Sequence, residues 1–253
     1  MNAFGFARRL RAVGCVAVCA ALVAPGCKGS TSAPDGALDP FGGGEPPQAR
    51  KASQANLKRI GLALHNYSGV NNILPFPGIG AGGQALRNTT DKPQLSWRVA
   101  LLPYVEEQTL YKQFHLDEPW DSEHNKQLVA LMPQVFAMPG GQAAMGQTHY
   151  RIFTGPKALK SGMRIPASFP DGTSNTILVV EAAEPVIWTK PDELPYDPAK
   201  PLPKLGLGGD GFNAMFGDGS VRFISRRATE KMLRAAIDPA DGMFLSPGWE
   251  DGH

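Results

Sequence analysis

The stretch that decides the fold is "GFNAMFGDGSVRFIS", residues 211–225, where Asp218-Gly219 separates two apolar runs. Asp-Gly between two such runs is a strong local signal for a β-hairpin. We predict a two-residue type I′ turn that sets Phe216 opposite Val221. That register places one set of side chains on a single face of the hairpin: Phe212, Ala214, Phe216, Val221 and Phe223. The pattern therefore assigns Asp218 and Gly219 to a structural turn rather than to an active site.

Two further β-rich runs precede the hairpin, "THYRIFTG" (148–155) and "NTILVVEAA" (175–183), and turn residues bound both. The apolar residues of "ILVV" do not alternate with polar ones, which is typical of a strand covered on both faces. We therefore expect 175–183 to be a central strand. "QVFAM" (134–138) is a candidate first strand.

Helical patterns dominate the chain before these strands. In residues 53–69, Leu57, Ile60, Leu64 and Tyr67 recur at helical spacing, with Ser53 as the expected N-cap. Residues 95–115 read as helix with Ser96 as N-cap, and Pro103 either kinks that helix or starts a second one. Short helices are expected at 125–132 and 228–237. Helices followed by strands predict an α+β fold, with an N-terminal helix packed on a mostly antiparallel sheet and long loops at 70–94 and 184–210.

The N-terminus has the features of a secretory signal. Arg8, Arg9 and Arg11 precede an apolar run of 15 residues, 12–26, which is short of the roughly 20 residues that a membrane span needs. Small residues before Cys27 are typical of a lipoprotein processing site, so we predict a lipid on Cys27. Plain secretion and an uncleaved anchor are the alternatives. We expect 1–26 to be the signal peptide, 27–48 a flexible tether and 49–253 a single domain.

Composition narrows the function classes. The chain has 253 residues, 42% of them hydrophobic, and a formal net charge of +2, so nothing suggests a nucleic-acid partner. Cleavage before Cys27 would leave that cysteine as the only one in the mature chain. An internal disulfide is then excluded even though the expected compartment outside the cytoplasm permits disulfides.

Several stretches together resemble the planctomycete family known as domain of unknown function 1559. They are "NLKRIGLALHNY" (56–67), "LSWRVALLPYVEEQTLYKQFHLDEPWDSEHN" (95–125), "DGTSNTILVVE" (171–181), "WTKPDEL" (188–194) and the hairpin at 211–225. The resemblance implies a fold similar to type IV pilins and pseudopilins, in which a long N-terminal helix lies on an antiparallel sheet. It implies no known activity. Typical members begin with a prepilin-like leader and a membrane-spanning helix half, and this chain has the lipoprotein-like signal and tether instead.

Candidate chemistry is sparse. "GLGGDG" (206–211) matches G-x-G-x-x-G, but a Pro-rich loop precedes it and a predicted strand follows, so a dinucleotide site is not expected. The loop "HLDEPWDSEH" (115–124) gathers carboxylates and imidazoles without a known metal-ligand spacing. We interpret it as a solvated acidic loop anchored by Trp120. No catalytic residue, cofactor or metal is predicted.

We therefore expect a non-enzymatic, membrane-attached envelope lipoprotein with a structural or protein-interaction role and an unidentified envelope partner. The expected interaction surface contains Trp120, Trp188 and Tyr196. The alternative is an extracytoplasmic lipoprotein that binds a solute or glycan, and an enzyme is the third reading.

Overall fold

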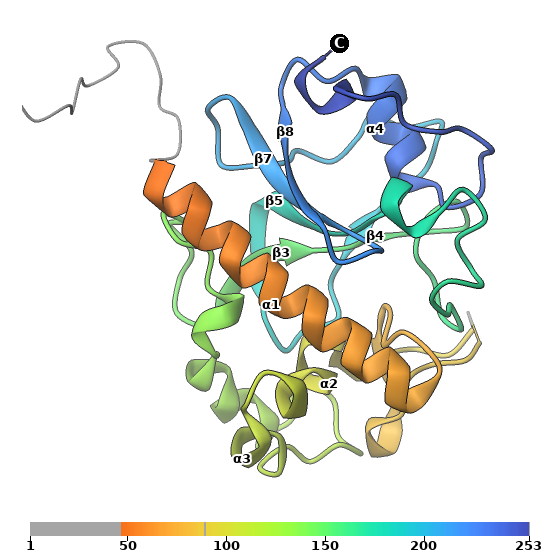
Figure 1. Ribbon diagram of the computed structural model, residues 1–253. Coiled ribbons are helices and arrows are strands. Elements are labelled where there is room, and N and C mark those ends of the chain that lie inside the picture. Colours follow the sequence, from red (N-terminus) through yellow and green to blue (C-terminus); the bar gives the residue numbers. More distant parts are fainter. Residues whose placement is uncertain (1–46, 89, 253) are drawn as a thin grey trace, which may run out of the picture. The chain divides into compact units, whose positions relative to one another are not determined.

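A 25-residue helix, α1 (Pro47–Asn71), lies across the main sheet in the computed structural model, which describes residues 47–88 and 90–252 (Figure 1). Leu57, Ile60 and Leu64 are fully buried on the face of α1 that meets the sheet, which confirms the predicted apolar stripe. The predicted N-cap is wrong, because α1 begins six residues before Ser53. Ser53 is fully buried in mid-helix, where polar partners from the sheet satisfy its hydroxyl.

The main sheet is antiparallel throughout, with spatial order β3-β5-β7-β8. Its strands are β3 (Gln147–Arg151), β5 (Ile177–Ile187), β7 (Gly211–Phe216) and β8 (Val221–Ser225). The first six residues of β5 are all buried. The predicted central strand, covered on both faces, is confirmed, and so is the α+β class with a helix packed on the sheet.

The hairpin forms at the predicted place, but its turn and register differ from the prediction. The N–H of Gly219 donates to the Phe216 carbonyl, and the N–H of Phe216 donates to the Ser220 carbonyl, each over 2.9 Å. Gly219 has φ +82°, whereas Asp218 does not have the positive φ that a type I′ turn requires. The connection is therefore a three-residue loop with Gly219 in the left-handed position.

The extra loop residue changes which side chains share a face. Val221 pairs with Met215 instead of Phe216, and Phe223 pairs with Asn213. A shift of one residue moves a side chain to the opposite face of a strand pair. Val221 and Phe223 therefore lie on the α1 side of the sheet, which corrects their predicted place beside Phe212.

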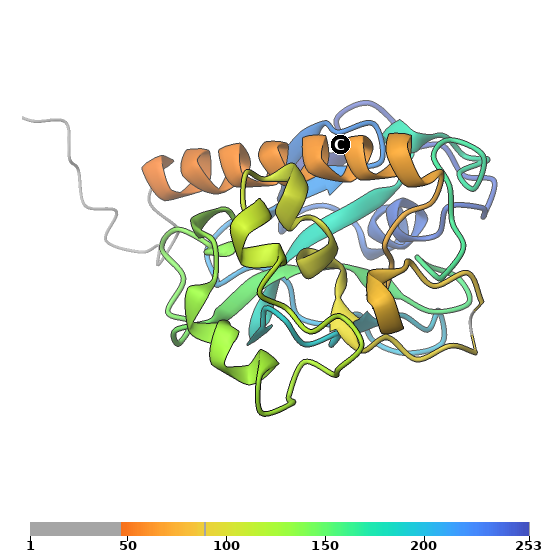
Figure 2. The same cartoon turned by 90° about the horizontal axis from the view of Figure 1, so that it is seen from below.

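The two faces of the sheet border two hydrophobic cores. Met215 and Leu178 join the core under α1, while Phe216 and Ile224 join a second core on the other face. The second core is closed by α4 (Glu230–Ile237) and by η6 (Trp249–Asp251), a turn of 3₁₀ helix. Figure 2 shows α1 running along one side of the strands.

The expected helix at 95–115 is broken into three turns. These are α2 (Trp97–Ala100), η2 (Leu102–Tyr104) and α3 (Gln108–Tyr111). The Ser96 cap is confirmed, because its Oγ accepts from the Arg98 N–H over 3.3 Å. Pro103 sits in the first turn of η2, so it starts a new turn rather than kinking a continuous helix.

The remaining elements are short. Residues 134–138 do not form the candidate strand but contain the 3₁₀ turn η4 (Gln134–Phe136), and the expected helix at 125–132 is the 3₁₀ helix η3 (Asn125–Leu131). Two small ladders pair β1 (Gly78–Ile79) with β2 (Leu95–Ser96) and β4 (Phe153–Thr154) with β6 (Leu194–Pro195). Single 3₁₀ turns form at η1 (Ala81–Gly83) and η5 (Thr173–Asn175). Within the described ranges, no helix has the length and apolarity to cross a membrane.

Candidate functional site

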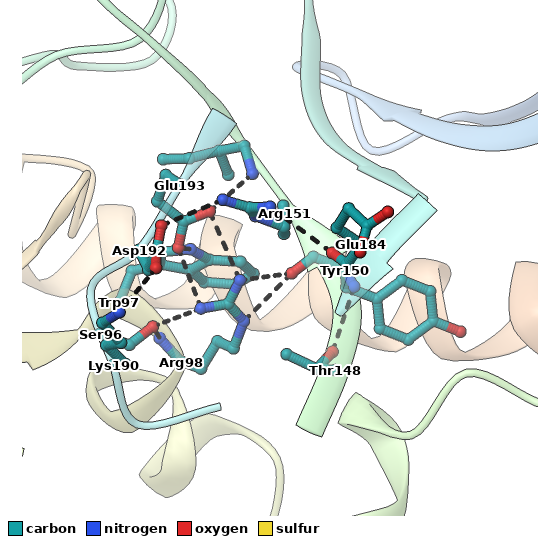
Figure 3. Close-up of polar contacts among 11 residues, drawn as sticks. Ser96, Trp97, Arg98, Thr148, Tyr150, Arg151, Glu184, Lys190, Asp192 and Glu193 are labelled. Carbon is teal, nitrogen blue, oxygen red and sulfur yellow. Dashed lines mark hydrogen bonds and ion pairs between the residues drawn. The ribbon is translucent and has the colours of Figure 1, made fainter. Parts of the chain in front are cut away.

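A buried ion pair joins α2 to the segment before β6 (Figure 3). The Arg98 Nη1 lies 2.9 Å from Glu193 Oε1, and both side chains are at most 2% exposed. Arg98 also donates to the Tyr150 carbonyl of β3 and, through Nη1, to Ser96 Oγ over 2.6 Å. The planar guanidinium thus ties three separate segments together, which a lysine ammonium would not do with the same geometry.

Glu193 accepts hydrogen bonds from three different residues. Besides Arg98, the indole Nε1 of Trp97 and the backbone N–H of Ile152 each donate to its carboxylate over 2.9 Å. Burial raises the pKa of the Glu193 carboxyl and lowers the pKa of the Arg98 guanidinium, while their attraction opposes both shifts. A charged pair this deep is tolerated because each partner's polar atoms are satisfied.

Charged side chains surround this pair on its outer side. Arg151 Nη2 lies 3.2 Å from Asp192 Oδ1, and Lys190 Nζ lies 2.8 Å from Asp192 Oδ2. Lys190 Nζ also stands 5.7 Å from the centre of the Trp120 ring. The network is organised from inside to outside, with the fully buried pair at its centre and a partly exposed pair at its edge.

A second buried polar cluster lies between α1 and the sheet. Ser53 Oγ of α1 hydrogen-bonds Tyr150 Oη over 2.7 Å and also donates to the Glu181 carboxylate of β5. Asn213 of β7 donates to Glu181 from its backbone N–H over 2.7 Å and from its side chain over 2.8 Å. Burial raises the pKa of Glu181, against the lowering effect of these donors.

Both clusters contain residue types that enzymes use, but their geometry makes them structural. Arg98, Ser53 and Asn213 are fully buried, and Glu181 is 1% exposed, so a substrate has no access to them. Each carboxylate is instead saturated by donors from the fold itself. Their chemical effect is to fix α1, α2 and the 188–194 segment on the sheet.

The expected aromatic surface is corrected for two of its three members. Trp188 is fully buried, stacks on Phe136 with ring centres 6.0 Å apart, and donates its indole N–H to the Val129 carbonyl. Tyr196 is 5% exposed and packs against Phe153 in the second core. A large aromatic ring contributes more stability in a core than in a loop, so these side chains pack inward.

Trp120 is half-buried in the acidic loop, and an asparagine organises that loop. The side chain of Asn125 is fully buried; it accepts from the His115 N–H and donates to the carbonyls of His115, Glu118 and Pro119. The rings of His115 and His124 stack with centres 3.6 Å apart. Among the described residues, no group of three or more ligating side chains is placed to hold a metal ion.

The outer face of α1 carries three unpaired cations and two exposed aliphatic side chains, and is defined here as Lys51, Lys58, Arg59, Leu62 and Val70. All five side chains are exposed, Leu62 by 63% and Val70 by 70%. Within residues 47–88 and 90–252, none of the three cations forms an ion pair, and α1 itself contains no Asp or Glu. Sequence reasoning identified the buried stripe of α1 but gave this opposite face no role.

Three other predicted features remain, the Asp218 turn, the "GLGGDG" motif and the lipid site, of which the last lies outside the described residues. Asp218 caps the hairpin loop, since its Oδ1 accepts from the Ser220 N–H over 2.8 Å. β7 begins at Gly211, the last residue of "GLGGDG", so the chain continues from those glycines into a strand and not into the helix that a dinucleotide site needs. The predicted lipid site, Cys27, lies outside the described residues and stays a prediction.

Comparison with known proteins concerns the first half of the folded region. Residues 47–142 match the family model described as a protein of unknown function (DUF1559). This match supports the family resemblance over that part of the chain. No match was found among the curated proteins or among the solved structures.

The segment that matches the family model does not contain all the residues of its buried polar clusters. Arg98 and Ser53 lie inside the matched residues, whereas their carboxylate partners Glu193 and Glu181 come from the later strands and loops. The matched segment and the sheet are therefore parts of one folded unit. No local signal marked these pairings, because their members lie 95 and 128 residues apart.

Proposed function

We propose that this protein is a non-enzymatic protein-interaction module of the cell envelope. It is held at a membrane by a lipid on Cys27, and the outer face of α1 binds an acidic surface of a partner protein. The role extends the coarse finding of a family of unknown function.

The outer face of α1 is the single observation that carries the proposal. Lys51, Lys58 and Arg59 have no carboxylate partner among the described residues, and the exposed Leu62 and Val70 follow them along the helix. Exposed aliphatic side chains beside a group of like charges are typical of a surface that docks a complementary partner. The apolar pair supplies contact area, and the cations select an acidic partner.

The charge count favours a protein over a lipid surface. Clusters of four to eight basic residues mark binding to anionic headgroups. The outer face of α1 offers three exposed cations in a helix of 25 residues. A helix of that length extends about 37 Å, which is long enough to span one side of a standard protein interface.

The buried polar clusters support a role without catalysis. Ser53, Glu181, Arg98 and Glu193 are the residues whose chemistry resembles that of catalytic groups, and all four are enclosed by the fold. Their saturation by internal donors favours rigidity, and a rigid helix presents its outer face with little loss of entropy on binding.

Site-specific photo-crosslinking in native membranes tests the proposal. A photoreactive amino acid replaces Leu62 in the full-length chain, and the matched control carries it at Met145, which is 82% exposed and far along the chain. We expect Leu62 to yield a discrete adduct with an acidic protein. Lys58→Glu with Arg59→Glu should abolish that adduct, whereas Lys231→Glu on α4 should not.

Three results would contradict the proposal. Adducts at Leu62 no more abundant than at Met145 would remove the evidence for docking at this face. Crosslinking to lipid alone would indicate a headgroup surface instead. Adducts that survive the charge reversal would show that the cations do not select the partner.

A further inference from the structure

A cavity of about 650 Å³ lies between the loop that precedes β2 and the loop that follows β4. Three prolines, Pro77, Pro93 and Pro156, form much of its apolar wall. The loops are fastened to their surroundings, since the Gly162 N–H donates to the Leu86 carbonyl over 3.1 Å. The volume falls within the range of about 300–1,000 Å³ that small-molecule sites occupy.

One polar side chain in this wall lacks a partner. Ser161 lines the cavity and is only 9% exposed. Its hydroxyl makes no hydrogen bond to any residue in the ranges 47–88 and 90–252. The residue is buried but its Oγ is not sealed from solvent, so a ligand in the cavity can accept its hydrogen bond in place of water.

Unpaired cations line the same cavity. Lys160 and Lys92 line the cavity, are exposed, and form no ion pair within the described part of the chain. Asp91 is the one carboxylate in the described wall, so the wall has an excess of positive charge. The neighbouring Lys157 differs, because it lies 3.5 Å from Asp238 and is already paired.

We propose that this cavity binds a small organic carboxylate. The ligand carboxylate accepts hydrogen bonds from Ser161 Oγ and Lys160 Nζ, Lys92 adds positive charge, and the carbon skeleton rests on the proline wall. This site is separate from the outer face of α1, so the proposal does not rest on the interaction role.

The wall chemistry favours a carboxylate over inorganic phosphate. Phosphate sites typically combine a lysine with the bidentate fork of an arginine or with several backbone N–H groups at a helix N-terminus. This cavity offers lysines and a hydroxyl, and no arginine lines it. The proline wall rewards a ligand with an apolar body, which phosphate lacks.

Isothermal titration of the full-length chain tests the proposal with a matched pair of sugars. D-galacturonate and D-galactose share a ring and differ in the carboxylate, and succinate, benzoate and inorganic phosphate complete the panel. We expect at least one carboxylate to bind while galactose does not. Lys160→Gln should weaken that binding about tenfold, in line with loss of one charge-assisted hydrogen bond.

Two variants separate binding from folding. Ser161→Ala removes a hydroxyl that has no protein partner, so the ligand-free melting temperature should stay unchanged while affinity falls severalfold. Lys157→Gln, outside this cavity, should leave affinity unchanged. Failure of all three carboxylates at millimolar concentration overturns the proposal, as does equal binding of galactose or phosphate, or full affinity in both Ser161→Ala and Lys160→Gln.

Discussion

At the scale of single residues, the fold depends on carboxylates that accept several hydrogen bonds at once. Glu193 accepts hydrogen bonds from Trp97, Arg98 and Ile152. Glu181 accepts hydrogen bonds from Ser53 and Asn213. Each carboxylate is surrounded only by hydrogen-bond donors. A neutral side chain of the same shape, such as an amide, cannot accept hydrogen bonds from all of them. The identity of these residues is therefore more constrained than their size.

Glu193→Gln should lower the free energy of unfolding by about 3 kcal/mol or more, because it breaks a buried ion pair and sets an amide N–H against donors. Urea denaturation of wild type and variant measures the change. Glu123→Gln is the matched control, since the Glu123 side chain is 91% exposed and its pair with Lys126 contributes little. Equal denaturation midpoints for wild type and Glu193→Gln would show that the pair is not structural.

His149 should make stability depend on pH. Its Nδ1 lies 2.9 Å from the Ala182 carbonyl, its Nε2 is buried without a partner among the described residues, and burial lowers the pKa of the ring. The unfolded state then binds a proton at higher pH than the folded state. The free energy of unfolding should fall as pH drops below about 6.5, the ordinary pKa of histidine.

The measurement is urea denaturation between pH 7.5 and 5, compared with His149→Asn, which retains a donor near Nδ1 but does not titrate. The variant should lose part of the pH dependence in this window. His115→Asn replaces an exposed histidine, and this variant should keep the full pH dependence of the free energy of unfolding. An unchanged slope in His149→Asn would assign the pH dependence to other groups.

At the scale of elements, residue spacing predicted where helices and strands occur better than it predicted where they begin or in which register strands pair. The stripe of Leu57, Ile60 and Leu64 predicted a helix at the right place, because burial on one face requires that period. The start of α1 was missed, since Ser53 has the local preference of a cap but finds its partners in the sheet. The hairpin register was missed because two-residue and three-residue loops are both common in hairpins and differ by one residue in the register they impose.

Gly61→Ala should stabilise the protein by about 0.5–1 kcal/mol, because alanine loses less backbone entropy in a helix than glycine does. A Cβ on Gly61 would lie 3.4 Å from Met215 Cγ and 3.6 Å from Gly219 Cα, which are ordinary contact distances. Thermal unfolding followed by circular dichroism measures the effect as a higher midpoint.

The contrasting variant is Gly219→Ala. Here φ is +82°, so alanine should destabilise the protein by about 1 kcal/mol or more. A lower midpoint for Gly61→Ala would mean that α1 and the hairpin are packed too closely for a methyl group.

At the scale of the whole molecule, residues 47–142 and the sheet form one folded unit. Its attachment to a membrane is a separate prediction from residues 8–27. The outer face of α1 and the carboxylate cavity belong to different elements of this unit. They are therefore open to independent tests.

Cys27→Ser should release the protein from the membrane fraction, because it removes the thiol that would carry the lipid. Fractionation of cells, followed by intact mass measurement, distinguishes the outcomes. Wild type should carry an acyl mass on Cys27 and the variant none. Wild type without a lipid, or a variant that stays in the membrane fraction, would contradict the predicted anchor.

The sequence by itself determined the α+β class, the buried face of α1, the central place of β5 and the presence of a hairpin at residues 211–225. These features follow from local periodicity and turn chemistry, which act over a few residues. Only the tertiary structure decided the hairpin register, the burial of Trp188 and Tyr196, and the partners of Ser53 and Arg98. Those depend on contacts between segments far apart in the chain, where burial and the need to satisfy buried polar groups outweigh local preference.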